Sequence, residues 1–166
     1  MLNLHTLMRA TPWNIVNNAG DVNVVKKNAW VEKDDKGEHK VFSGKLLTRG
    51  PDKKPRNVTI KMYGSRTANG QMRRKTRHPV WVHCDCEYFL YYLEVAVTAR
   101  GSSSVITSNG NFPKIRNPRM KPYLCKHLLR ASREAWKEKP KKRQVSRLTA
   151  MEIDDMVKLA QPFIPR

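Results

Sequence analysis

Acidic residues are scarce in this sequence. It has 14 Asp and Glu against 33 Lys and Arg in 166 residues, a formal net charge of +19 at pH 7. A charge of this size and one sign creates a strong positive field, whose natural partner is a polyanion. An acidic protein surface is a second candidate partner. Anionic lipid is the weakest, because we find neither an amphipathic basic helix nor an acylation signal.

Long apolar runs are also missing. No stretch approaches the ~18 apolar residues of a transmembrane helix. The first ten residues lack the apolar segment of a secretory signal. We therefore expect a soluble protein that is not secreted. Its length suits one ordinary domain with a core, or a smaller core with extended arms.

Cysteine is rare, and the three that occur follow one local pattern. Cys84 and Cys86 stand two positions apart, and Cys125 is followed at the same spacing by His127. An odd number of cysteines argues against a disulfide framework. Zinc prefers four thiolate or imidazole ligands in a tetrahedron. We predict that these four residues bind one structural zinc ion.

Two alternatives to this ligand set remain. The cysteines could be buried as small apolar residues with His127 on the surface, but this does not explain why every cysteine belongs to a two-residue pair. His83 is a competing ligand beside Cys84. We expect it to be exposed or to support the site from outside, since the side chain before a metal-binding cysteine tends to point away from the metal.

The remaining patterns predict an α+β fold with a small antiparallel sheet. Strands are expected over residues 22–31, 40–48, 57–63 and 79–83, where apolar or β-branched residues lie between turn signals. Apolar stripes predict helices over 87–100 and 124–136. A capping box of Thr149 and Glu152 starts a last helix, which Pro162 ends. Residues 1–20 show no sustained period, and we expect an arm or a short helix followed by a loop.

The spacing Cys84-x-Cys86, then 38 residues, then Cys125-x-His127 resembles the SWIM-type zinc finger. This resemblance implies those four zinc ligands and a role in binding DNA or protein. Arg100-Gly101, Ser108-Asn109-Gly110, Asn117-Pro118 and Pro122 are similar to small SWIM-containing proteins of tailed bacteriophages. That second resemblance implies the host cytoplasm or the virion as location, and otherwise we expect the cytoplasm.

The sequence is thus divided into four parts. These are an N-terminal arm and strand of unknown fold (1–35), a basic β-hairpin region (36–78), the SWIM-type zinc finger (79–136), and a basic linker with a C-terminal helix (137–166). Catalysis is not expected, because four soft ligands leave no open position for water on the zinc. Deaminase, phosphate-loop and nucleophile-elbow motifs are also absent. No small-molecule substrate is expected.

Positive charge is concentrated in two blocks. Residues 36–80 and residues 114–147 each carry 13 Lys and Arg against 2 acids, whereas a solvated face normally mixes both signs. The candidate polyanion contacts are Arg66, Arg73, Arg74, Lys75, Arg77, Lys141, Lys142 and Arg143. Two hypotheses follow. The chain is a structural component of an assembly, such as a phage virion, whose basic arms contact DNA or acidic neighbouring subunits, or it is a free nucleic-acid-binding regulatory protein.

Overall fold

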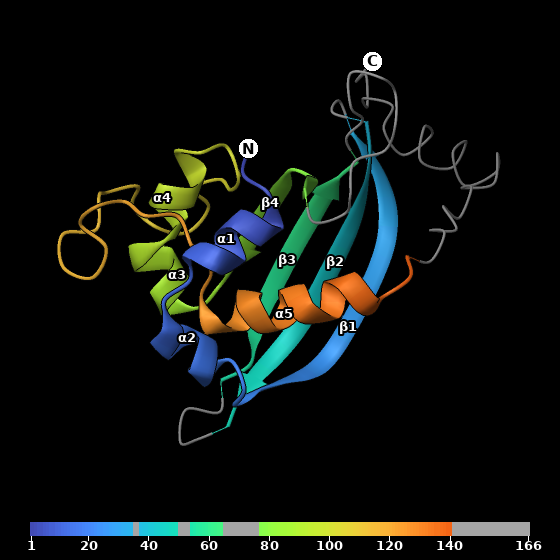
Figure 1. The fold of residues 1–166 in the computed structure, drawn as a ribbon, viewed down its shortest axis with the longest axis horizontal. Helices are drawn as coiled ribbons and strands as arrows, with labels where there is room; N and C mark the ends of the chain where they lie inside the picture. The colour runs from blue at the N-terminus through green and yellow to red at the C-terminus, as the bar shows by residue number, and fades with distance from the viewer. Residues whose placement is uncertain (35–36, 50–53, 65–76, 141–166) are drawn as a thin grey trace, which may run out of the picture.

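The computed structural model describes residues 1–34, 37–49, 54–64 and 77–140. Its centre is a sheet of four antiparallel strands in the order β1 (Val22–Asp34), β2 (Gly37–Thr48), β3 (Arg56–Tyr63) and β4 (Val80–Cys84) (Figure 1). With the helices around it, this sheet confirms the predicted α+β class. The helix expected from Thr149 lies outside the described residues.

Alternation along the strands gives the sheet one apolar face. Residues two apart on a strand point to the same side of the sheet, and on one side of this sheet a run of such alternate residues is buried. On β2 these are Phe42, Gly44 and Leu46. The neighbouring strands add Val58, Ile60, Val80 and Val82 to the same core. A bulge between Val24 and Lys26 shifts the register of β1 against β2, which keeps the side chains on both sides of the bulge in phase with the core.

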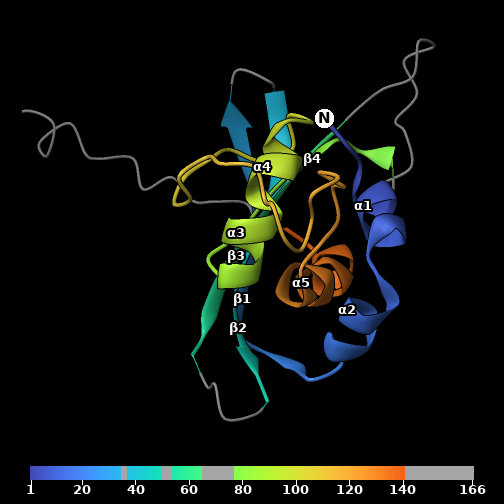
Figure 2. The ribbon, with the colours of Figure 1, turned by 90° about the vertical axis from the view of Figure 1, so that its left-hand side faces the viewer.

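Helix α5 (Lys126–Lys137) lies across this apolar face (Figure 1). Its buried residues include Leu128, Leu129, Ala131 and Ala135. The predicted apolar stripe is therefore in the core, although the helix begins two residues later than expected. Figure 2 shows α5 nearly end-on, with the sheet on one side and two further helices on the other.

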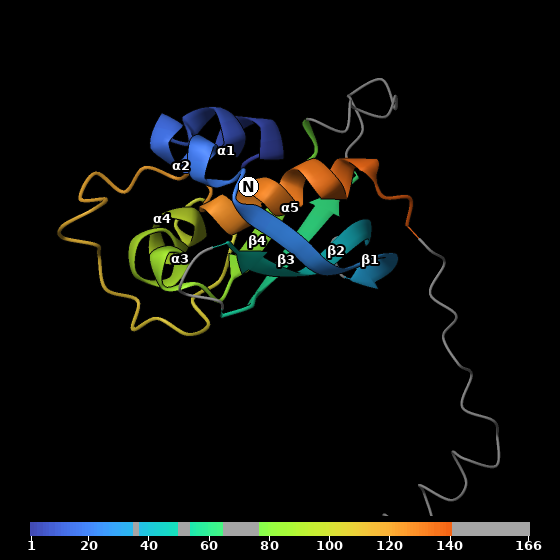
Figure 3. The ribbon, with the colours of Figure 1, turned by 90° about the horizontal axis from the view of Figure 1, so that it is seen from below.

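Those two helices come from the N-terminal segment, for which the sequence predicted an arm or a short helix followed by a loop. They are α1 (Leu4–Ala10) and α2 (Trp13–Asn18). Leu4, Leu7 and Ile15 enter the core. Figure 3 shows the resulting order from below, with α1 and α2 stacked on α5 and α5 on the sheet. The Asn3 side chain accepts a hydrogen bond from the Thr6 N–H and caps α1.

The single helix predicted over residues 87–100 is wrong in part. The chain forms two short helices, α3 (Glu87–Tyr92) and α4 (Glu94–Thr98), which bend at Leu93, where φ is −122°. Glu94 is fully buried after this bend. Its carboxylate accepts hydrogen bonds from the backbone N–H groups of Ile106 and Ser108, at 3.2 and 3.1 Å. A buried carboxylate thus fixes the long loop (residues 99–125), which apolar periodicity could not reveal.

The start of the long loop also covers the outer edge of β4. The Val82 N–H donates to the Ser102 carbonyl and the Ser103 hydroxyl donates to the Val82 carbonyl, at 2.8 and 2.7 Å. The Val80 N–H donates to the Leu2 carbonyl in the same way. Ser102 and Ser103 are buried, and together they satisfy backbone groups on the edge strand of the sheet. No helix in the described part of the chain is long and apolar enough to cross a membrane.

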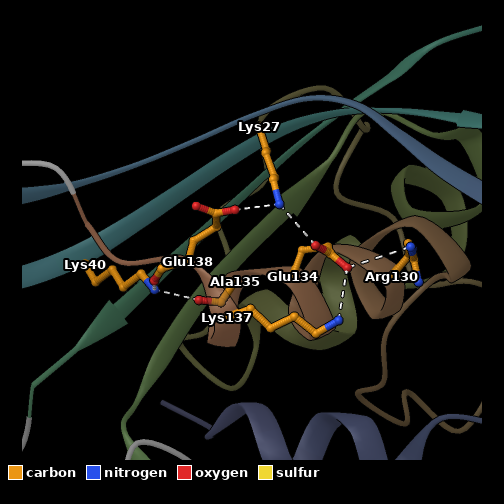
Figure 4. A network of polar contacts seen from close by, with 7 residues as sticks. All are labelled: Lys27, Lys40, Arg130, Glu134, Ala135, Lys137 and Glu138. Carbon is orange, nitrogen blue, oxygen red and sulfur yellow. Dashed lines mark hydrogen bonds and ion pairs between the residues drawn. The ribbon is translucent and has the colours of Figure 1, made fainter.

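A polar network ties the C-terminal end of α5 to the sheet (Figure 4). The Lys27 ammonium of β1 lies 2.5 Å from a carboxylate oxygen of Glu138 and 3.3 Å from one of Glu134. The side chains of Glu138 and Glu134 raise the pKa of Lys27 by hydrogen bonding to it. The Lys40 ammonium of β2 donates to the carbonyls of Ala135 and Glu138. A cation therefore caps the last turn of α5, where the helix leaves carbonyls unsatisfied.

We expect Lys40→Met to lower the free energy of unfolding by about 1 to 2 kcal/mol, because it keeps the aliphatic stem and removes a charged donor from two carbonyls. Lys45→Met is the control, since Lys45 is exposed on the same strand and should change stability by less than about 0.5 kcal/mol. Urea denaturation of both variants measures the difference. Equal values for the two would show that the cap contributes nothing.

Candidate metal centre

The four predicted ligands come together where β4, α3 and α5 meet. Cys84 is the last residue of β4, Cys86 and Cys125 immediately precede α3 and α5, and His127 is the second residue of α5. One donor atom from each lies within 4.8 Å of the others, and all four residues are buried. A tetrahedron with zinc–sulfur bonds of about 2.3 Å has edges of about 3.8 Å. The donors therefore lie close to the distances that a shared ion requires.

Two of the cysteines also cap helices. The Cys86 sulfur accepts the Phe89 N–H at 3.4 Å, and the Cys125 sulfur accepts the Leu128 N–H at 3.5 Å. Each sulfur thus lies at the positive end of a helix, where backbone N–H groups stabilise negative charge. Cys86 and Cys125 thus share one local structure, in which a cysteine with extended backbone caps the helix that follows it.

Asp85 lies between Cys84 and Cys86 and holds in place the turn that carries these two side chains. Its carboxylate accepts hydrogen bonds from the Asn57 backbone N–H at 2.9 Å and from the Asn57 side-chain amide at 2.7 Å. The turn is thereby attached to the start of β3. This role of Asp85 was not predicted, although an Asp in a short turn is a recognisable signal of side-chain to backbone hydrogen bonding.

The two ring nitrogens of His127 have different surroundings. Nε2 lies 3.0 Å from the hydroxyl oxygen of Thr48. Nδ1 is buried and has no hydrogen-bond partner among the described residues. A buried polar atom without a partner costs about 1 to 3 kcal/mol. A metal at Nδ1 would satisfy it, while Nε2–H donates to Thr48 and fixes the tautomer. Thr48 lies far away in the sequence, and no local pattern could have indicated it.

Burial disfavours the negatively charged thiolate form of the cysteines in this cluster. It raises the pKa of the Cys84 and Cys125 thiols well above the ordinary value. Hydrogen bonds from Cys125 and Cys84 lower the pKa of Cys86. Three thiolates in one buried space need a nearby counter-charge, which a divalent cation supplies. Three thiols and one imidazole form a soft donor set that fits zinc.

His83 lies outside the cluster, although it adjoins Cys84. Its Nδ1 is 3.7 Å from a carboxylate oxygen of Glu94, and its ring stacks beside Trp81 with centroids 6.1 Å apart. Alternation on β4 places His83 and Trp81 on the face opposite to Cys84. This agrees with the expectation that the His83 side chain points away from the metal ligands.

Of the candidate polyanion contacts, the structure describes only Arg77, which is exposed in the short segment before β4. The others lie outside the described residues, and they are Arg66, Arg73, Arg74, Lys75, Lys141, Lys142 and Arg143. Comparison of the chain with protein-family models, with curated proteins and with solved structures finds no match.

Proposed function

We propose that Cys84, Cys86, Cys125 and His127 hold one structural zinc ion, as the resemblance to SWIM-type zinc fingers implies. The observation that carries this proposal is the convergence of four buried residues with soft donors, and the unpartnered Nδ1 of His127 adds support to it. Zinc would join the end of β4 and the start of α3 to the start of α5. The long loop separates these segments in the sequence, so the ion would add a direct link between them.

The role we propose is non-enzymatic. A catalytic zinc keeps one position open for water and usually has a general base beside it. Here four protein donors would complete the tetrahedron. Asp85, between the two cysteines, is bound to Asn57. The Glu87 side chain is 73% exposed and lies 3.6 Å from the Arg56 guanidinium, so it already pairs with a cation. Its position in the first turn of α3 also suits the helix dipole.

We propose that this zinc-stabilised fold acts by contact, as a component of an assembly that binds DNA. The support is the net charge of +19, which a fold of this size does not need for stability. A phage origin remains a prediction from the resemblance alone. The alternative is a free nucleic-acid-binding regulatory protein.

One observation favours contact with neighbouring subunits as well. The long loop is anchored at Glu94, yet it exposes large apolar side chains. Ile106, Phe112 and Ile115 are 58%, 72% and 85% exposed. Single exposed apolar residues are common, but several on one internally fixed loop suit a protein contact. A fixed copy number in purified particles would support the assembly role, and its absence there would favour the free DNA-binding protein.

The DNA contact can be tested with the zinc-loaded chain and a mixed-sequence duplex of 20 base pairs. We expect the logarithm of the binding constant to fall linearly with the logarithm of salt concentration, by about 0.9 per phosphate neutralised. Fluorescence anisotropy at several salt concentrations gives the slope. Absence of duplex binding even at low ionic strength would contradict the proposal.

A further inference from the structure

A surface pocket of about 540 Å³ opens directly beside the candidate metal centre. Cys86, Cys125 and His127 form part of its wall. Residues of α2, the end of β2, the start of β3 and the long loop complete it, so it exists only in the folded chain.

Five of the lining residues are cations, and they come from separate segments. They are Arg49, Lys54, Arg56, Arg116 and Lys126. Glu87 is the only acid among the described residues that line the pocket, and it already pairs with Arg56. Zinc with three thiolates and a neutral imidazole would add a single negative charge. The cations outweigh both, so the pocket attracts anions.

Two further features favour a phosphate group over other anions. The N-terminus of α5, a helix of 12 residues with no acid in its first turn, opens into the pocket at Lys126, and backbone N–H groups there suit phosphate oxygens. Arg116 stacks over the Tyr92 ring at 5.3 Å from its centroid. Stacking holds the planar guanidinium in place, and its paired donors match two phosphate oxygens.

We infer that this pocket binds phosphate groups of a nucleic-acid backbone, seated against the candidate metal centre. The inference rests on the proposed DNA contact and says where that contact is made. It differs from the sequence prediction, which assigned the contact to runs of neighbouring basic residues. The pocket instead gathers cations that lie as far apart as residues 49 and 126. A single patch of this kind fixes the orientation of the duplex on the protein.

The test compares two triple variants of the zinc-loaded full chain. The pocket variant is Arg49→Gln, Arg116→Gln and Lys126→Gln. Arg56 is kept because it donates to the Asp85 carbonyl and pairs with Glu87. The control variant removes the same charge with Arg9→Gln, Arg100→Gln and Lys33→Gln, which are exposed and do not line the pocket. Zinc content and melting temperature establish that both variants are folded.

The pocket variant should reduce the magnitude of the salt slope for the duplex by about 2 to 3, since three phosphate contacts are lost. The control should reduce it by less than about 1. ATP, titrated as a second probe, distinguishes the source of the phosphate. If the wild type binds ATP but not duplex, and only the pocket variant loses ATP, the pocket stands and the proposed DNA contact fails. If both variants weaken duplex binding equally, the DNA contact stands and the pocket inference is overturned.

Discussion

Cys125→Ser should cost the protein both its metal and most of its tertiary structure. Structural zinc contributes apparent binding free energies of about 10 to 16 kcal/mol in small fingers, and a domain's total stability is about 5 to 15 kcal/mol. Cys125 is fully buried and caps α5, the helix that covers the sheet. Loss of the ion would therefore release the helix around which the core is built. Elemental analysis and near-ultraviolet circular dichroism measure the two losses.

Thr48→Val serves as a graded comparison, because no cysteine of this chain lies outside the cluster. It removes the hydroxyl that contacts His127 Nε2 and leaves all four ligands in place. We expect it to keep zinc with an affinity about 10- to 100-fold lower, as when an outer partner of a ligand is lost. A wild-type protein that is folded and free of metal after purification in zinc-containing medium would refute the metal site itself.

Leu128→Ala should produce the second largest effect, a loss of about 2 to 5 kcal/mol in the free energy of unfolding. Leu128 is completely buried in the first turns of α5, and α5 packs between the sheet and the α1–α2 pair (Figure 3). Because both sides of α5 are covered, the surroundings have little room to relax into the cavity. Guanidinium denaturation at a fixed zinc concentration measures the change.

Ile115→Ala is the control for this substitution. It removes apolar atoms from a side chain that is 85% exposed, so it should change the free energy of unfolding by no more than about 0.5 kcal/mol. A Leu128→Ala protein as stable as Ile115→Ala would mean that α5 is not part of the core.

The strands were predictable because their signals are local. Alternating apolar residues and the turn residues after them locate β1 and β2, although each strand runs three residues further toward the turn than predicted. For the N-terminal segment, the sequence could not decide between an arm and a short helix, and it gave no sign of two helices. They have 7 and 6 residues, and helices this short are marginal in isolation. Burial of Leu4, Leu7 and Ile15 against the rest of the core is what stabilises them.

A buried carboxylate follows the bend at Leu93 and holds part of the long loop. Glu94 falls within a pattern that reads as a single helix, and nothing in the local sequence indicates that Ile106 and Ser108 bind it. The apolar stripe correctly marked buried residues such as Phe89 and Val97. It could not show that the backbone between them changes direction, because side-chain burial and backbone continuity are separate properties.

By itself, the sequence determined the candidate ligand pairs, the sheet and the sign of the charge, since each depends on residues close together in the chain or on composition. Two-residue spacing suffices to aim Cys84 and Cys86 at one point. Only the tertiary structure decided which nitrogen of His127 stays free for a ligand, because Thr48 reaches the other across the fold. The tertiary structure also decided which cationic side chains line one pocket. Arg49, Arg116 and Lys126 meet only when the end of β2, the long loop and α5 pack together. A site whose residues lie close together in the chain can be recognised from the sequence, whereas a site shared by distant segments exists only after the core has brought them into contact.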